Sequence, residues 1–179
     1  MLTARDLTDG KEPMSYAEIE CLKKLSRMLP ENPAIVNIGA DTGVSTLAFL
    51  EERPDCFIFS VDILPCEEEM RHVQEGGHDK KKVVRLLGDS KKIGPKFPYQ
   101  CDMLFIDGDH WGAGKDIEAW VDTGKVKSGG VIAFHDFQRF GCAPNNPGSV
   151  TEDVLEWSEA NPEYKQIAEV ERVIAFRMP

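Results

Sequence analysis

The chain has 179 residues, of which 41% are hydrophobic and 29% are charged, and its formal net charge is −10 at pH 7. This length predicts one domain with a substantial hydrophobic core. The negative charge argues against nucleic acid or an anionic membrane as the main partner, because both are themselves negative. No apolar stretch approaches membrane-spanning length, and the N-terminus lacks a signal-peptide pattern, so we expect a cytoplasmic protein.

The five cysteines form no CxxC pair and no metal-finger spacing. An odd, scattered set of this kind is typical of a reducing compartment. Cys56 and Cys101 each begin an apolar run, so we expect both to be buried thiols.

The first 30 residues predict an arm followed by a helix. Residues 1–14 have weak periodicity and contain two breakers, Gly10 and Pro13. Ser15 and Glu18 have the spacing of a capping box, which opens an amphipathic helix that ends at Pro30. We expect residues 1–30 to precede a core at residues 34–178 within a single domain, 1–179.

The stretch from Ala34 to Thr46 predicts a buried strand, a glycine turn and a helix. Glycines at positions 39 and 43 suit a backbone that turns sharply and lies close to a ligand. The helix then directs free N–H groups toward that ligand. The pattern is not a full GxGxxG, because Asp41 stands where the second glycine would be. An ordinary strand-to-helix turn remains the alternative.

Two further buried strands are expected at residues 56–62 and 83–87, and an acid follows each. Asp62 comes about twenty residues after Gly43, the distance at which a second strand delivers an acid to a ribose hydroxyl. Its alternative role is a helix cap or a solvated loop acid. Asp89 is suited to accept a hydrogen bond from an adenine amino group, and its alternative role is to cap the next turn.

A fourth strand is expected from Asp102, and its four consecutive apolar residues, 103–106, lead directly into Asp107, Gly108, Asp109 and His110. Carboxylates this close repel one another unless a cation lies between them. Carboxyl ends of parallel strands are also where ligands bind in doubly wound sheets. The alternative reading is turn chemistry, since Asp-Gly is a common turn pair. A helix is expected next, at residues 113–126.

A fifth strand, at residues 129–134, ends in His135 and Asp136. If this strand neighbours the fourth, these two side chains emerge near Asp107. Two carboxylates and an imidazole form a plausible site for a hard cation. A histidine at a strand end is nevertheless more often a hydrogen-bonding residue than a ligand.

The remaining chain predicts a long loop, a helix and a hairpin. The Gly/Pro/Asn-rich loop at residues 137–149 is long enough to form one wall of an active site. A helix follows to about residue 160, and residues 164–170 and 172–178 alternate like an antiparallel hairpin. Five strand–helix alternations therefore predict an α/β fold with a doubly wound sheet.

The chain resembles the class I S-adenosylmethionine-dependent methyltransferases. Within this class it looks most similar to small-molecule O-methyltransferases related to macrocin O-methyltransferase and the cephalosporin-hydroxylase-like group. The most specific matches are FIDGDH at residues 105–110 and GGVIAFHD at residues 129–136. The resemblance covers about residues 34–178. It implies a Rossmann-like, seven-stranded sheet of order 3-2-1-4-5-7-6, with strand 7 antiparallel.

The resemblance also implies how S-adenosylmethionine would bind. The expected cofactor-binding residues are Gly39, Ala40, Asp41 and Gly43 at the methionine end, Asp62 at the ribose, Asp89 and Ser90 at the adenine, and Asp107. Two positions depart from the class pattern. Asn37 stands where these enzymes often carry an acid, and Asp41 replaces a glycine.

In metal-dependent relatives, an acid at the Asp107 position and a pair of acids after the fifth strand bind Mg²⁺. The resemblance therefore implies a metal site of Asp107, His135 and Asp136. Because His135 replaces an acid, Mn²⁺ or another imidazole-tolerant ion becomes the favoured alternative to Mg²⁺. We expect methyl transfer to a hydroxyl of a small-molecule acceptor, with His135 or His110 as the base and Asp107 as an essential residue.

Two other interpretations stay open at this point. One is another Rossmann-fold enzyme, such as a nicotinamide-dependent oxidoreductase, and the other is a non-catalytic protein that binds S-adenosylmethionine. The sequence does not identify the acceptor or decide whether a metal is required. It also leaves the oligomeric state open, with a homodimer among the options.

Overall fold

The computed structural model describes residues 1–109, 113–138 and 148–179. Its sheet contains β1 (Ala34–Ile38), β2 (Phe57–Asp62), β3 (Val83–Leu87), β4 (Cys101–Ile106), β5 (Val126–Phe134), β6 (Lys165–Val170) and β7 (Val173–Arg177). The longer helices are α1 (Tyr16–Arg27), α2 (Val44–Glu52), α3 (Glu67–Glu75) and α6 (Val150–Ala160). Shorter helical segments are η1 (Ala4–Leu7), η2 (Lys80–Lys82), α4 (Ser90–Ile93), η3 (Gly94–Lys96), α5 (Ala113–Asp116) and the π-helical η4 (Ile117–Val121).

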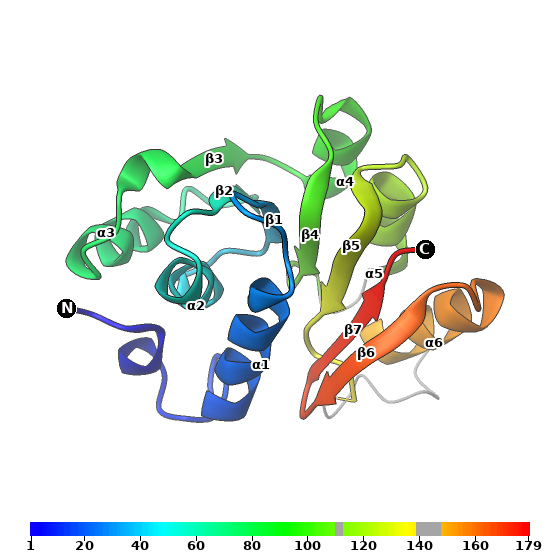
Figure 1. The fold of residues 1–179 in the computed structure, drawn as a ribbon, viewed down its shortest axis with the longest axis horizontal. Helices are drawn as coiled ribbons and strands as arrows, with labels where there is room; N and C mark the ends of the chain where they lie inside the picture. The colour runs from blue at the N-terminus through cyan, green and yellow to red at the C-terminus, as the bar shows by residue number, and fades with distance from the viewer. Residues whose placement is uncertain (110–112, 139–147) are drawn as a thin grey trace.

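The seven strands form one sheet in the order β3-β2-β1-β4-β5-β7-β6 (Figure 1). Strands β1 to β5 run parallel, whereas β7 is antiparallel to both β5 and β6. This order and the reversed β7 confirm the predicted topology. The carboxyl ends of β1, β2, β3 and β4 consequently meet along one edge, where the predicted acids follow the strands.

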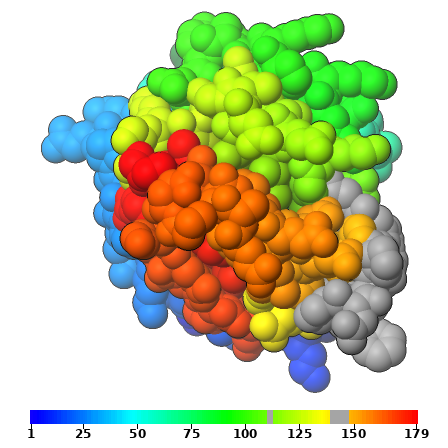
Figure 2. All heavy atoms as spheres, turned by 90° about the vertical axis from the view of Figure 1, so that its right-hand side faces the viewer, coloured from blue at the N-terminus to red at the C-terminus, as the bar shows by residue number. Residues whose placement is uncertain are grey.

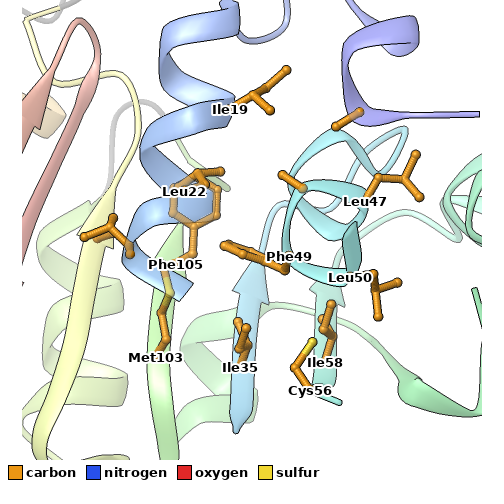
Figure 3. Packing of buried hydrophobic residues seen from close by; sticks show 14 of the residues in the cluster. Ile19, Leu22, Ile35, Leu47, Phe49, Leu50, Cys56, Ile58, Met103 and Phe105 are labelled. Carbon is orange, nitrogen blue, oxygen red and sulfur yellow. The ribbon is translucent and has the colours of Figure 1, made fainter. Parts of the chain in front are cut away.

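Hydrophobic cores fill both faces of the sheet. On one face, α1 and α2 pack against the strands, and Figure 3 shows Leu22 of α1 and Phe49 of α2 beside Phe105 of β4. The Phe49 and Phe105 rings meet edge-on, with centroids 6.0 Å apart. On the other face, residues of η4 and α6, including Trp120 and Trp157, cover the sheet. Both layers are needed because a parallel sheet has two apolar faces.

The arm at residues 1–14 packs against the core. The backbone N–H of Leu2 donates to the Glu75 carbonyl of α3, and that of Ala4 donates to the Glu51 carboxylate of α2. The predicted capping box is confirmed at the start of α1, where Ser15 and Glu18 exchange side chain-to-backbone hydrogen bonds.

The predicted helix at residues 113–126 is wrong at its C-terminal end. Regular α-helix stops at Asp116, and the following turn is π-helical and ends at Val121. Gly124 then adopts φ +71°, a conformation that reverses the chain at no steric cost. Val126 already belongs to β5 and pairs with Cys101 of β4.

Edge strand β6 and helix α6 lie side by side on one face, with the C-terminal end of the chain nearby (Figure 2). Cys56 and Cys101 are buried, as predicted, and both are free thiols. In the described parts of the chain, no helix combines the length and apolar character needed to cross a bilayer.

Replacing Phe49 by alanine should lower the free energy of unfolding by about 3–5 kcal/mol, because the side chain is fully buried and leaves a cavity. Phe57→Ala is the matched control, since Phe57 is 42% exposed at the start of β2. Urea unfolding of both variants checks this. An equal decrease in the free energy of unfolding for both variants would contradict the packing described for α2.

Candidate active site

Two adjoining cavities lie along the edge where β1 to β4 end. The first, of about 410 Å³, is lined at its far end by Asp89 and Ser90. The second, of about 400 Å³, reaches Asp107 and His135. Both are lined by Gly39, Asp62, Ile63 and Gly108, so they form one groove across the strand ends.

Gly39 is the position where the turn after β1 requires glycine. Its φ is +81°, and a Cβ atom there would lie 2.2 Å from the backbone oxygen of Asp107. The end of β1 therefore packs directly against the tip of β4. Gly43 also has a positive φ, +91°, and it begins α2 against Glu69 of α3. Asp41 lines the groove with a left-handed backbone, φ +43°.

Asp62 lies in the middle of the groove and orders the loops on both sides of it. One carboxylate oxygen, Oδ2, accepts from the backbone N–H of Asp41 at 3.2 Å. The other, Oδ1, accepts from the N–H of Leu64 at 2.8 Å. The residue thus acts as a loop acid, which was one predicted alternative, and also lines both cavities.

At the far end of the groove, Asp89 caps α4 through a hydrogen bond from the Lys91 N–H at 3.1 Å. This is the turn role that the sequence left as the alternative, although Asp89 lines the cavity as well. Ser90 donates its hydroxyl to the buried carboxylate of Asp116. Across the cavity, Lys91 forms an ion pair with Asp109 at 2.8 Å.

Asp107, His135 and Asp136 come together, as expected if β4 and β5 are neighbours. One potential ligand atom from each lies within 4.8 Å of the others. His135 Nδ1 is 2.9 Å from Asp107 Oδ1 and 3.5 Å from Asp136 Oδ1. Asp136 adopts φ +59°, which directs the chain away immediately after the strand. His110, the other predicted base, lies outside the described residues, as does most of the loop at residues 137–149.

The surroundings of His135 favour its protonated form in the metal-free protein. Burial alone would lower the pKa of its imidazole, but the carboxylates of Asp107, Glu18 and Asp136 outweigh burial and raise the pKa to about 10. This shift favours the protonated ring in the metal-free protein, and that form donates hydrogen bonds. The role of His135 as a base stays a prediction, and it requires the deprotonated ring.

Glu18 and Arg172 belong to the same cluster, and sequence reasoning missed both. Glu18 Oε2 lies 3.5 Å from His135 Nε2, and its carboxylate accepts from Arg172 Nε at 2.8 Å and Nη2 at 3.0 Å. Burial would raise the pKa of Glu18, but the nearby imidazole of His135 and the hydrogen bonds from Arg172 lower it to about 2. The capping-box spacing explained Glu18 locally, so the sequence did not point to its contact with His135. Arg172, in the hairpin turn, belongs to no sequence motif that predicts a place in the cluster.

Asn37, one of the departures from the class pattern, lies beneath the glycine turn and does not line the groove. Its amide group donates to the hydroxyls of Ser45 and Thr46 at 3.0 Å. Thr46 in turn donates to the buried carboxylate of Glu69 at 2.6 Å, and Ser60 of β2 donates to the same carboxylate at 2.8 Å. This buried polar network joins β1, β2, α2 and α3 below the turn.

The fold and the acid-lined groove at its strand ends define a Rossmann-like enzyme of the methyltransferase type. The chain belongs to the family described as "Methyltransferase domain", whose model matches residues 36–137. No curated protein matches the chain.

Solved methyltransferases share the fold at low sequence identity. The O-methyltransferase TomG of Streptomyces achromogenes, involved in tomaymycin synthesis and solved with SAM, has a TM-score of 0.74 and 17% identity, with 93% of this chain and 82% of that chain covered. A Podospora anserina methyltransferase bound to SAH has a TM-score of 0.74 and 16% identity, with 98% of this chain and 84% of that chain covered. MycE of the mycinamycin pathway was solved with Mg, SAH and mycinamycin VI. It has a TM-score of 0.71 and 12% identity, with 98% of this chain and 52% of that chain covered.

The ion pair between His135 and Glu18 predicts a pH optimum of stability in the metal-free protein. The pKa of Glu18 falls from 4.5 to about 2, so its contribution is present above pH 4.5 and is lost as the pH falls through 2. The pKa of His135 rises from 6.5 to about 10, so its contribution is complete below pH 6.5 and is lost as the pH rises through 10. The pair therefore stabilises most between pH 4.5 and 6.5.

Urea unfolding of chelator-treated protein between pH 2 and pH 6.5, which spans the loss of the Glu18 contribution on the acid side, measures the effect. We expect Glu18→Gln to reduce the loss of stability on the acid side, by on the order of 1–3 kcal/mol. Glu20→Gln is the control, because Glu20 lies on the same helix with a side chain that is 37% exposed. An unchanged pH dependence in Glu18→Gln would refute the pairing.

Proposed function

We propose that the chain transfers a methyl group from S-adenosylmethionine to a hydroxyl oxygen of a small molecule, with assistance from a divalent cation. The observation that carries the proposal is the continuity of the site. One groove passes Asp89, Asp62 and Gly39 and ends at the cluster of Asp107, His135 and Asp136. Family membership supports methyl transfer, and TomG, MycE and the Podospora anserina enzyme support this cofactor by analogy of fold.

The groove has the chemistry that the cofactor requires. S-adenosylmethionine supplies an electrophilic methyl group on a sulfonium centre. Apolar side chains of Ile38, Val61 and Ile63 line the first cavity and suit an adenine ring. Asp62, in the middle, suits ribose hydroxyls, and the turn at Gly39 brings backbone close to the amino-acid end. Asp89 and Ser90 would lie at the adenine end, and Ala40, Asp41 and Gly43 at the methionine end.

The cluster of Asp107, His135 and Asp136 fits a divalent cation. Its three donors lie within 4.8 Å of one another, and carboxylate and imidazole ligands together suit Mn²⁺ as well as Mg²⁺. A bound cation lowers the pKa of an alcohol that contacts it. Asp107 lines the groove, so it is placed to orient an acceptor hydroxyl in line with the methyl donor.

Proton removal from the acceptor is assigned to the histidines. His135 serves as a base only when it is not a metal ligand and has lost the proton that its carboxylate neighbours stabilise, because a ring with Nδ1 on the cation and a proton on Nε2 has no free nitrogen. His110 follows the tip of β4 in sequence and remains the second candidate. The reaction is an in-line displacement, so positioning by the groove supplies much of the rate.

S-adenosylhomocysteine should bind the purified chain with a micromolar Kd, about −8 kcal/mol, in a calorimetric titration. Asp62→Asn should weaken this binding by about 10–100-fold, since hydrogen bonds to a charged group contribute about 1.5–3 kcal/mol. Asp122→Asn, on an exposed turn after η4, is the control and should bind normally. Binding of NADH in place of S-adenosylhomocysteine would contradict the proposal and favour an oxidoreductase.

Asp107→Asn should abolish methyl transfer while leaving S-adenosylhomocysteine affinity within a few-fold of the wild type. The reason is that Asp107 is placed at the acceptor end of the groove and contacts His135. The assay measures transfer of labelled methyl from S-adenosylmethionine to a panel of phenols, sugars and macrolides. A fully active Asp107→Asn enzyme would refute the site. Cofactor binding with no turnover by the wild type on any acceptor would favour a non-catalytic binding protein.

A further inference from the structure

The imidazole of His135 presents its two nitrogens to different partners. Nδ1 faces the candidate cation site, 2.9 Å from Asp107 Oδ1 and 3.5 Å from Asp136 Oδ1. Nε2 is buried and makes no hydrogen bond to any residue that the structure describes, and the carboxylate it faces is Glu18, with Oε2 at 3.5 Å. A proton on Nε2 therefore has one evident acceptor, and that acceptor lies on α1.

Arg172 holds the Glu18 carboxylate in place. Oε1 accepts from the Arg172 backbone N–H at 3.0 Å and from Nε at 2.8 Å, while Oε2 accepts from Nη2 at 3.0 Å. The guanidinium also donates to the carbonyls of Lys11 and Pro13. Two parallel bonds from a planar guanidinium fix a carboxylate more tightly than a single contact does. The Glu18 side chain is 0% exposed, so water does not compete for it.

We propose that Glu18 is a positioning residue that accepts the Nε2–H of His135 and so presents Nδ1 as a ligand to the divalent cation. This inference rests on the metal-assisted function proposed above. A ligating histidine commonly donates its second N–H to a carboxylate, which fixes the tautomer and raises the basicity of the ligating nitrogen. Here that carboxylate comes from α1, and Arg172 in turn orients it.

Capping of α1 does not by itself explain why a carboxylate occupies position 18. The cap requires one oxygen to accept from the Ser15 N–H, at 2.7 Å, and a neutral glutamine side chain meets that need equally well. An ionised carboxylate is costly to bury unless opposite charges surround it. The cluster holds three carboxylates, from Glu18, Asp107 and Asp136, around the imidazole of His135 and the single guanidinium of Arg172. It therefore has room for a divalent cation beside a neutral His135.

The experiment measures Mn²⁺ binding by the full chain after chelator treatment, using the electron paramagnetic resonance signal of free Mn²⁺. We expect one saturable site in the wild type and a 10–100-fold weaker Kd in Glu18→Gln, the range typical of lost outer-sphere partners. Glu20→Gln, on the exposed side of α1, is the matched control and should bind Mn²⁺ like the wild type. If Glu18 served only to cap α1, the Glu18→Gln substitution would leave the Mn²⁺ affinity unchanged.

S-adenosylhomocysteine affinity is measured on the same samples, because Glu18 lines neither cavity and its loss should leave cofactor binding unchanged. Arg172→Lys is the second variant, expected to weaken Mn²⁺ binding by less, and it carries the test if circular dichroism shows that Glu18→Gln is unfolded.

Equal Mn²⁺ affinity in the wild type and a folded Glu18→Gln variant, or in Arg172→Lys if that variant carries the test, overturns the role of Glu18 and leaves the proposed function intact. Absence of Mn²⁺ binding by a wild type that binds S-adenosylhomocysteine overturns the metal site and the role of Glu18 together. Absence of both kinds of binding overturns the proposed function itself.

Discussion

At the carboxyl ends of β4 and β5, three carboxylates, an imidazole and a guanidinium are packed largely out of contact with water. Burying such charges costs several kcal/mol each unless their geometry and hydrogen bonds compensate. The structure meets this condition through Arg172, which grips Glu18, and through His135, which bridges Glu18 and Asp107. The network thereby ties α1 and the β6–β7 turn to the strand ends, so fold stability and site geometry depend on the same contacts.

The groove depends on a second constraint, the close approach of β1 to β4. Gly39 lets the two strand ends meet within a distance that leaves no space for a Cβ atom. Beneath it, Asn37 and Glu69 anchor the turn and the start of α2 through hydroxyl groups. Burial raises the pKa of Glu69, while hydrogen bonds from Thr46 and Ser60 partly oppose this. A buried hydrogen-bond network below the groove suits a bound ligand whose reacting atom must stay aligned with the acceptor.

The sheet order and the site's location could be predicted from sequence because both follow from simple regularities. Apolar runs followed by acids mark parallel strands, and parallel strands bring their carboxyl ends to one edge. Asp107, His135 and Asp136 were therefore expected to meet, and they do. The roles of Glu18 and Arg172 were not predictable in this way. Their contact joins residues far apart in the chain, and it arises only when α1 packs beside the closing hairpin.

Local signals also concealed longer-range roles. The Ser15–Glu18 spacing correctly predicted a capping box, yet the same carboxylate reaches His135. The prediction of His135 as a base relied on the pKa of an isolated imidazole, near neutral pH, whereas its carboxylate neighbours raise that pKa to about 10 in the metal-free protein. The end of the helix after residue 113 was misplaced because periodicity does not distinguish a π-helical turn from an α-helical one.

A crystal structure of the chain with S-adenosylhomocysteine and Mn²⁺, with anomalous data collected at the manganese edge, tests the account most directly. The account predicts the ribose at Asp62, the adenine beside Asp89, and a single anomalous peak coordinated by Asp107, His135 and Asp136. A nucleoside bound away from this groove, or a manganese ion that avoids those three side chains, would contradict it.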